Sequence, residues 1–185
     1  MEGKAMRYLL VSLLLVLTAC QTYPTLNEDS PYSAVPRESR LILHKAIALA
    51  PEQTRVYLQH GGVVPFENRD AFYAHCRIEL SPTKQIAPTI EPDEFVIYKV
   101  TQQILVSDGP PPGVLLAGGS GSDKGGIDSK LYARILHLRS ARQPGVLRLR
   151  CQRWDDLAFS KHLSISEIRE TLGNTLTLQL AKQAG

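Results

Sequence analysis

Residues 131–153, LYARILHLRSARQPGVLRLRCQR, decide the fold of this chain. Apolar and polar side chains mostly alternate along both ends of the stretch, as in strands that bury one face. The two ends are joined by residues 140–145, SARQPG, whose Pro-Gly pair is typical of a turn. The stretch therefore predicts an antiparallel β-hairpin with strands at 131–139 and 146–153.

Similar alternation recurs before and after the hairpin. It is found in Arg55–His60, Phe72–Leu80, Glu94–Val106 and Thr175–Leu180. The apolar stretch Leu41–Leu49 fits either a strand or a helix, and Pro51 ends it in both cases. Six or seven modest strands, without regular strand–helix alternation, predict a mainly β antiparallel domain. Its form is expected to be a sandwich or a partly open barrel.

One helix is expected in the C-terminal region. Ser164 and Glu167 have the spacing of a capping box, in which each side chain binds the other's free backbone N–H. Gly173 is placed to end the helix. The apolar face of this helix is formed by Ile165, Ile168 and Leu172.

The first residues are typical of a secretory signal. Lys4 and Arg7 precede the apolar run Tyr8–Leu17, whose 10 residues are too few for a membrane span of about 20. The run leads into Leu17-Thr18-Ala19-Cys20, with a small residue before the cysteine. Translation from Met6 instead of Met1 would keep Arg7 and change nothing in this interpretation.

The order Leu17-Thr18-Ala19-Cys20 resembles the lipobox of bacterial lipoproteins. This resemblance covers only the signal, and it implies cleavage before Cys20, diacylglycerol on its sulfur and an acyl chain on its new amine. Three such chains would anchor the protein stably to a membrane. Gln21 is not the Asp that tends to retain such proteins at the inner membrane, so we expect the outer membrane, facing the periplasm. The alternative is an ordinary secretory signal with a chance cysteine.

The chain is then expected to have three parts. Residues 1–19 are the signal peptide, and residues 20–39 are a lipidated tether that is polar and rich in proline. Residues 40–185 form a single β-rich domain, in which the Gly-, Pro- and Ser-rich residues 107–129 are expected to be a flexible loop. A flexible tether of this length has an average reach of about 25 Å.

Cleavage leaves two cysteines, Cys76 and Cys151. The periplasm is oxidising, so this pair is expected to form a disulfide. Both cysteines fall on the apolar side of an alternating strand, and two such strands can bring them together across a core. Buried free thiols and a metal site are the alternatives, but neither cysteine has a second cysteine or a spaced histidine nearby.

The charge balance argues against nucleic acid, because the part after the signal has 19 basic and 17 acidic side chains. Basic residues nevertheless gather in 129–154, which contains no acidic residue. Near a membrane, they could contact anionic lipid, lipopolysaccharide phosphates or an acidic envelope protein. Alternation places Arg148 and Arg150 on the outward face of the hairpin. The residues expected to make this contact are Arg134, Arg148, Arg150 and Arg153. Alternatively, this is a solvated strand face balanced by the carboxylates of neighbouring strands, such as Glu79, Glu91, Asp93 and Glu94.

No catalytic, metal or cofactor motif is predicted. Residues 118–125, GGSGSDKG, lack the Gly-Lys-Ser/Thr order of a phosphate loop and the Gly-x-Ser-x-Gly order of an esterase elbow. The histidines show no metal-binding spacing. The sequence therefore favours a non-enzymatic lipoprotein that binds or helps to assemble envelope components. The alternative is a periplasmic, hydrolase-like enzyme whose site is assembled from distant residues.

Overall fold

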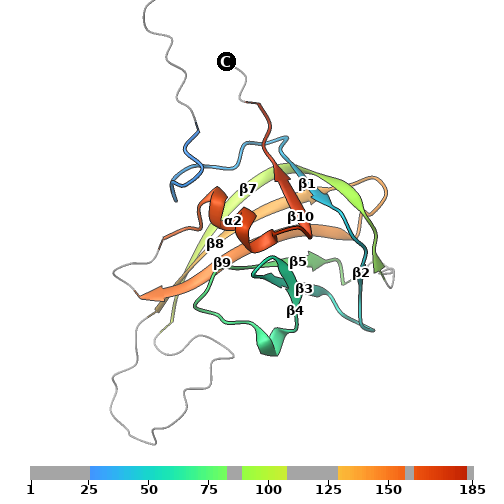
Figure 1. The fold of residues 1–185 in the computed structure, drawn as a ribbon, viewed down its shortest axis with the longest axis horizontal. Coiled ribbons are helices and arrows are strands. Elements are labelled where there is room, and N and C mark those ends of the chain that lie inside the picture. The colour runs from blue at the N-terminus through green and yellow to red at the C-terminus, as the bar shows by residue number, and fades with distance from the viewer. Residues whose placement is uncertain (1–25, 83–88, 108–128, 157–160, 183–185) are drawn as a thin grey trace, which may run out of the picture.

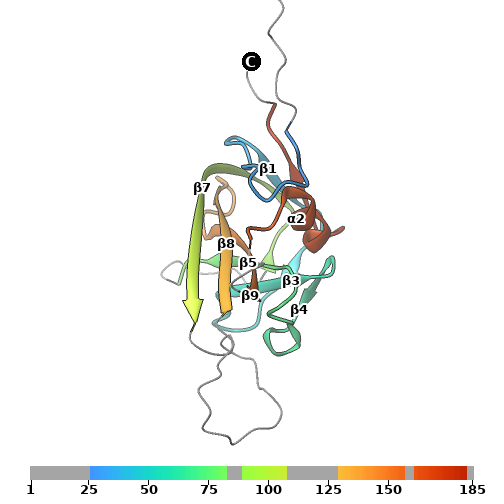
Figure 2. The same ribbon diagram turned by 90° about the vertical axis from the view of Figure 1, so that its left-hand side faces the viewer.

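The computed structural model describes residues 26–82, 89–107, 129–156 and 161–182. These residues form an eight-stranded antiparallel sheet that curls into a half-barrel, with an α-helix on its inner side (Figures 1 and 2). The prediction of a mainly β fold with one helix near the C-terminus is confirmed. The sheet takes the form of a partly open barrel, whose inner, helix-facing side we call concave and whose outer side we call convex.

The strands of the large sheet follow the order β10-β1-β7-β8-β9-β5-β3-β4. Their bounds are β1 Arg40–Leu43, β3 Arg55–Gln59, β4 Gly62–Val64, β5 His75–Leu80, β7 Asp93–Ser107, β8 Ser129–Arg139, β9 Val146–Asp156 and β10 Leu176–Gln179. Two short strands, β2 (Ile47–Ala48) and β6 (Thr89–Ile90), pair separately. A 3₁₀ turn, η1, covers Phe66–Asn68.

The predicted hairpin forms the middle of the sheet. Strands β8 and β9 pair antiparallel from His137 opposite Arg148 to Ser129 opposite Asp156. On the other side of β8 lies β7, which pairs with it as far as Ser107 and carries an irregularity between Ile97 and Lys99. The three strands form a long antiparallel meander, so the side chains of each strand alternate between the concave and convex faces.

The helix α2 (Ile165–Leu172) packs its apolar side into the concave face. Ser164 and Glu167 make both hydrogen bonds of the predicted capping box. The predicted apolar face is also confirmed, because Ile165, Ile168 and Leu172 are fully buried. They join one hydrophobic core with residues from β1, β3, β5, β7, β8, β9 and β10. Burying an aliphatic side chain of this size contributes about 1.5–3 kcal/mol, so this face holds the helix in place.

A close backbone contact fixes the end of α2. Gly173 ends the helix with φ 52°, and its amide donates to the carbonyl of Arg169. A Cβ on Gly173 would lie 2.3 Å from the Cα of Gly61 in the turn between β3 and β4. The amide of Gly61 also donates to the carbonyl of Thr171. The helix and the β3–β4 turn therefore approach as closely as two glycines allow.

The folded body begins earlier than the sequence predicts. Residues 26–39 were expected to belong to the tether, but they lie against the domain. Val35 is 3% exposed and belongs to the core, and Glu28 forms an ion pair with Arg169 of α2. The side chain of Asp29 accepts a hydrogen bond from Ser166. The proline-rich composition predicted a free tether for these residues, but a segment without regular secondary structure can still be held against a domain by side-chain contacts. Cys20 and residues 108–128 of the predicted loop lie outside the described residues.

Among the described residues, no helix is long and apolar enough to cross a membrane.

Candidate anion-binding surface

Cys76 and Cys151 form a disulfide. They face each other in register on the adjacent strands β5 and β9, with their Cα atoms 4.0 Å apart. Both are fully buried. The predicted pair is therefore confirmed, but it links neighbours within one sheet and does not cross the core. The register that the disulfide fixes also places Arg77 opposite Arg150 and Glu79 opposite Arg148.

The four arginines predicted to contact an anion lie on two different faces. Arg148 and Arg150 are on the convex face, where they contact Glu79 and Gln103. Arg153 is on the concave face and pairs with Glu167 of α2. Arg134 lies there too and is fully buried. The four arginines therefore do not share one contact surface, because strand alternation separates Arg134 and Arg153 from Arg148 and Arg150.

One carboxylate organises the convex basic cluster. The two oxygens of Glu79 accept hydrogen bonds from the Nε atoms of Arg77 on β5 and Arg148 on β9. Burial raises the pKa of Glu79, but these two guanidinium groups outweigh burial and hold its pKa below the usual range. The carboxyl is thus ionised at neutral pH and holds both arginines by their Nε atoms.

Arg150 extends this cluster with neutral partners. Its Nε donates to Gln152 and its Nη1 to Gln103, at 2.6 Å each. Burial lowers the pKa of Arg150, and the charge of Arg77 lowers it further. Arg55 and Arg148 also repel its charge. We call Arg55, Arg77, Arg148 and Arg150 the convex arginine cluster; Glu79 is the carboxylate that lies among them.

A buried histidine continues the network beyond Gln152. The Nδ1 of His75 lies 2.9 Å from the carbonyl of Tyr73, and its Nε2 lies 3.1 Å from the side-chain nitrogen of Gln152. This geometry fits a neutral ring that donates from Nδ1 and accepts at Nε2. Burial lowers the pKa of His75 to about 4, and Arg69 and Arg77 also lower it. His75 therefore adds no charge at neutral pH and serves to hold Gln152.

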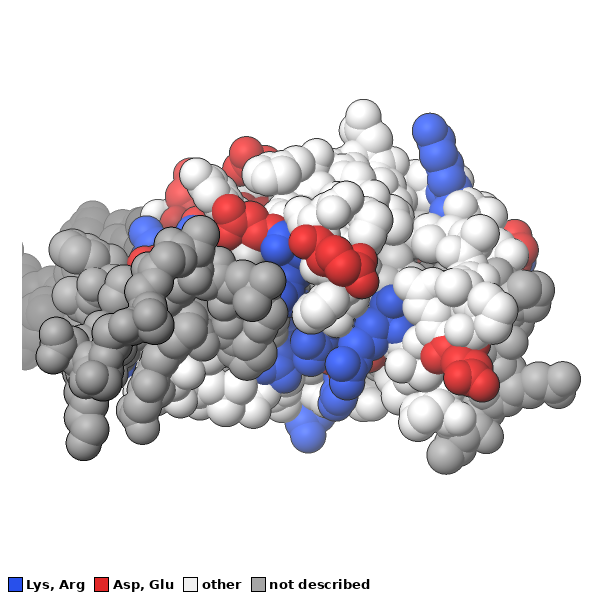
Figure 3. Space-filling view, turned by 90° about the horizontal axis from the view of Figure 1, so that it is seen from below, with Lys and Arg blue, Asp and Glu red and all other residues white. Residues whose placement is uncertain are grey.

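The surface view from below Figure 1 shows the same charge pattern. Basic side chains form a band across the middle of this face, with acidic side chains beside it (Figure 3). The alternative of a balanced strand face holds only in part. Of the carboxylates expected to balance the arginines, Glu79 binds Arg77 and Arg148, and Asp93 pairs with Arg142 outside the cluster. Glu94 pairs with Arg40, which also lies outside it. The described part of the cluster thus keeps an excess of positive charge.

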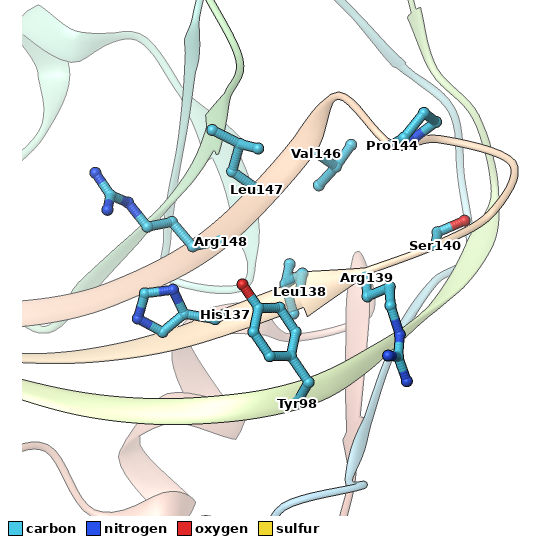
Figure 4. A pocket seen from close by; sticks show the side chains of 9 residues that line it. All are labelled: Tyr98, His137, Leu138, Arg139, Ser140, Pro144, Val146, Leu147 and Arg148. Carbon is cyan, nitrogen blue, oxygen red and sulfur yellow. The ribbon is translucent and has the colours of Figure 1, made fainter.

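A pocket of about 450 Å³ adjoins the cluster at the closed end of the β8–β9 hairpin. Arg148 borders both the pocket and the cluster. The other lining residues that carry polar or aromatic groups are Tyr98, His137, Arg139 and Ser140, and the remainder are Leu138, Pro144, Val146 and Leu147 (Figure 4). None of the lining residues is acidic. Such a pocket suits an anionic group with an apolar portion beside it.

His137 in this pocket is held in place. Its Nε2 lies 3.0 Å from the hydroxyl of Thr101, and its ring lies 6.0 Å from that of Tyr98. Burial lowers the pKa of His137, and the charges of Lys99 and Arg148 lower it further. The imidazole therefore stays neutral at pH 7, and the positive charge of the pocket comes from its arginines.

A smaller cavity of about 190 Å³ lies beside α2 and bears on the enzyme alternative. It brings His60 near Glu167 and Glu170. The hydroxyl of Thr171 also lines it, but it donates to the carbonyl of Glu167. Glu167 in turn is held by Arg153 and by the amide of Ser164. Thr171 and Glu167 are therefore occupied in structural contacts.

Within the described ranges, no three His, Cys, Asp or Glu side chains are close enough to hold a metal ion. The chain matches no protein-family model, no curated protein and no solved structure.

The sequence missed Arg55, Arg77 and His75 as members of the convex surface. The signal was present in Phe72–Leu80, whose odd positions are mostly polar. Pairing Cys76 directly with Cys151 would have placed these odd positions beside Arg148 and Arg150. Arg55 carries no comparable signal, because its place depends on the pairing of β3 with β5.

Proposed function

We propose that this chain is a lipid-anchored protein of the outer membrane that works without catalysis, by binding an anionic envelope component on its convex face. The observation that supports this most directly is the convex arginine cluster, in which four arginines surround the single carboxylate of Glu79. A guanidinium group that is fixed at Nε presents its remaining N–H groups to an oxyanion without first losing much side-chain freedom.

The position of the anchor narrows the choice of ligand. If Cys20 carries the lipid, only residues 21–25 separate it from Leu26, and five residues span at most about 18 Å. Residues from Leu26 onward lie beside α2 at the top of Figure 1, whereas the basic band is seen from below (Figures 1 and 3). The basic band therefore faces away from the anchoring leaflet. An acidic region of a periplasmic partner protein fits this arrangement better than the head groups of the same membrane.

Capture from the envelope tests this proposal. The lipidated wild-type chain and the double variant Arg55→Gln, Arg148→Gln would be cross-linked in intact cells and their partners identified by mass spectrometry. The variant keeps the Arg77–Glu79 pair, so Glu79 is not left without a cation. We expect a partner with an acidic surface that the wild type captures and the double variant does not.

A matched variant controls for net charge. Lys45 and Lys182 are exposed and lie outside the cluster, so Lys45→Gln with Lys182→Gln removes the same number of charges. This control should capture the partner as well as the wild type does. Equal loss in both double variants, or equal capture by all three proteins, would reject the convex cluster as the binding surface.

A further inference from the structure

Arg134 is the most unusual buried group of the described chain. It points from β8 into the concave side and is 0% exposed. Its Nη2 donates to the carbonyl of Pro31 at 2.9 Å, while its Nε and Nη1 have no hydrogen-bond partner. A buried guanidinium group loses its hydration, and a single carbonyl does not replace it. This side chain therefore lacks its counter-charge.

The groups around Arg134 do not supply that charge. Glu167 of α2 is the carboxylate that attracts it, but its oxygens are held by Arg153 and by the amide of Ser164. Arg153 adds a second cation from β9. Burial lowers the pKa of His162, and the nearby charge of Arg134 lowers it further. The buried Nδ1 of His162 has no hydrogen-bond partner either. The ring of His162 packs edge-on against Tyr132, 4.8 Å away.

The cover over Arg134 is held by contacts that can open. Pro31 belongs to the segment 27–33, which we call the N-terminal strap. Glu28 of the strap pairs with Arg169, and Asp29 accepts from Ser166, both on α2. The side chains of Arg169 and Glu28 are 39% and 33% exposed, so water screens this ion pair and it contributes little stability. These contacts lie near the surface of the domain, so the strap can lift while Val35, which follows it, stays in the core.

We propose that Arg134 and His162 form a second anion site, beneath the N-terminal strap, that binds a phosphate group. Arg134 offers three N–H donors on its two unpaired nitrogens, and His162 offers Nδ1. The oxygens of a phosphate group point in several directions and can accept from both side chains, and Arg favours bidentate contacts with phosphate. The site lies on the concave face and is independent of the convex arginine cluster. A phospholipid head group and free phosphate both present the phosphate oxygens that this site would bind. Binding of a phospholipid rests on the proposed anchor at Cys20, whereas binding of free phosphate does not.

Thermal unfolding in the presence of anions tests the site. The chain from residue 20 would carry Cys20→Ser to remove the acyl group, and Arg55→Gln with Arg148→Gln to weaken the convex cluster. Inorganic phosphate should raise the Tm of this parent on the order of 5 °C as it saturates the site, compared with chloride at equal ionic strength. The same parent with Arg134→Met should show no such rise. Lys45→Met, at an exposed position outside both proposed anion-binding surfaces, should respond like the parent.

The variants also separate a ligand site from a structural arginine. Without phosphate, Arg134→Met should unfold at the same temperature as the parent or higher, because it removes an unpaired buried charge. Arg134→Lys keeps the charge and should retain part of the phosphate response. A lower Tm for Arg134→Met without phosphate, or an equal phosphate response with and without Arg134, would overturn the proposal.

A vesicle experiment distinguishes the two sources of phosphate. Vesicles of phosphatidylglycerol and phosphatidylcholine would be tested for binding to the parent and to Arg134→Met. A phosphate response accompanied by Arg134-dependent vesicle binding assigns a lipid head group, and a phosphate response alone assigns free phosphate. Failure of the convex cluster in the capture experiment would not affect either result, since the parent already lacks two of its arginines.

Discussion

Removing the Cys76–Cys151 bridge should cost about 4 kcal/mol of the free energy of unfolding. The two cysteines are 75 residues apart, and closing a loop of that length removes roughly this much chain entropy from the unfolded state. A single domain is typically stable by about 5–15 kcal/mol, so the bridge accounts for a large share of the total. The loop encloses β5, β7, β8 and most of β9, and therefore constrains the central part of the sheet.

Urea unfolding measures this cost. The oxidised chain would be compared with the same chain after reduction and with the double variant Cys76→Ala, Cys151→Ala. With a denaturant slope of about 2 kcal/mol per molar urea, the midpoint should fall by about 2 M. The reduced wild type keeps both side chains, so it separates the bridge from the loss of two buried sulfur atoms. The variant should lie slightly below the reduced protein, because it also loses packing.

Two results would refute this reasoning. A midpoint that falls by less than about 0.5 M after reduction would mean that the bridge does not constrain the unfolded chain as the loop length requires. Cysteines that react with an alkylating agent in the unreduced, urea-unfolded protein would mean that the bridge is absent. The mass of the protein after alkylation shows directly whether these cysteines have reacted.

Two further predictions concern local contacts. Gly173→Ala should destabilise the protein by about 3 kcal/mol or more, because its Cβ would meet the backbone of Gly61 at 2.3 Å and its φ is 52°. Gly62→Ala is the control and should change stability by no more than about 1 kcal/mol, because nothing lies within 4 Å of its Cβ; the urea midpoints of the two variants are compared. His75 has its folded-state pKa lowered to about 4 from 6.5, so only the unfolded chain takes up this proton as pH falls between those values. Stability should therefore fall by up to about 3 kcal/mol from pH 6.5 to pH 4 through His75, and the variant His75→Gln should show a drop that is smaller by that amount.

Most of the fold could be predicted from the stretches in which polar and apolar residues alternate. Their polar and apolar positions predicted the β8–β9 hairpin, and the spacing of Ser164 and Glu167 predicted α2, because these signals act over a few residues. The short strands β2, β4 and β6 escaped prediction, since two or three residues show no usable period. In β7 the irregularity between Ile97 and Lys99 changes which residues face the core. Phe95 and Ile97 are buried, while Tyr98, Ile104 and Val106 are exposed.

The candidate site was harder to predict, because it depends on which strands are neighbours. Arg148 and Arg150 were expected to face outward, and they do lie on the face opposite α2. Arg134 and Arg153 were grouped with them only by closeness in sequence, and the alternation of β8 and β9 sends them to the other face. The role of Glu79 as the centre of the cluster required the register of β5 with β9. That register is set by long-range pairing, which composition and local period do not encode.

Binding of a labelled acidic peptide, followed by fluorescence anisotropy, tests the central claim most directly. The probe would be a glutamate-rich peptide, and the protein would be the chain from residue 20 with Cys20→Ser. We predict saturable binding that weakens as salt rises and that falls at least tenfold in Arg55→Gln, Arg148→Gln, but not in Lys45→Gln, Lys182→Gln. Equal affinity in the two double variants would show that binding follows net charge alone, and it would contradict a specific anion-binding surface on the convex face.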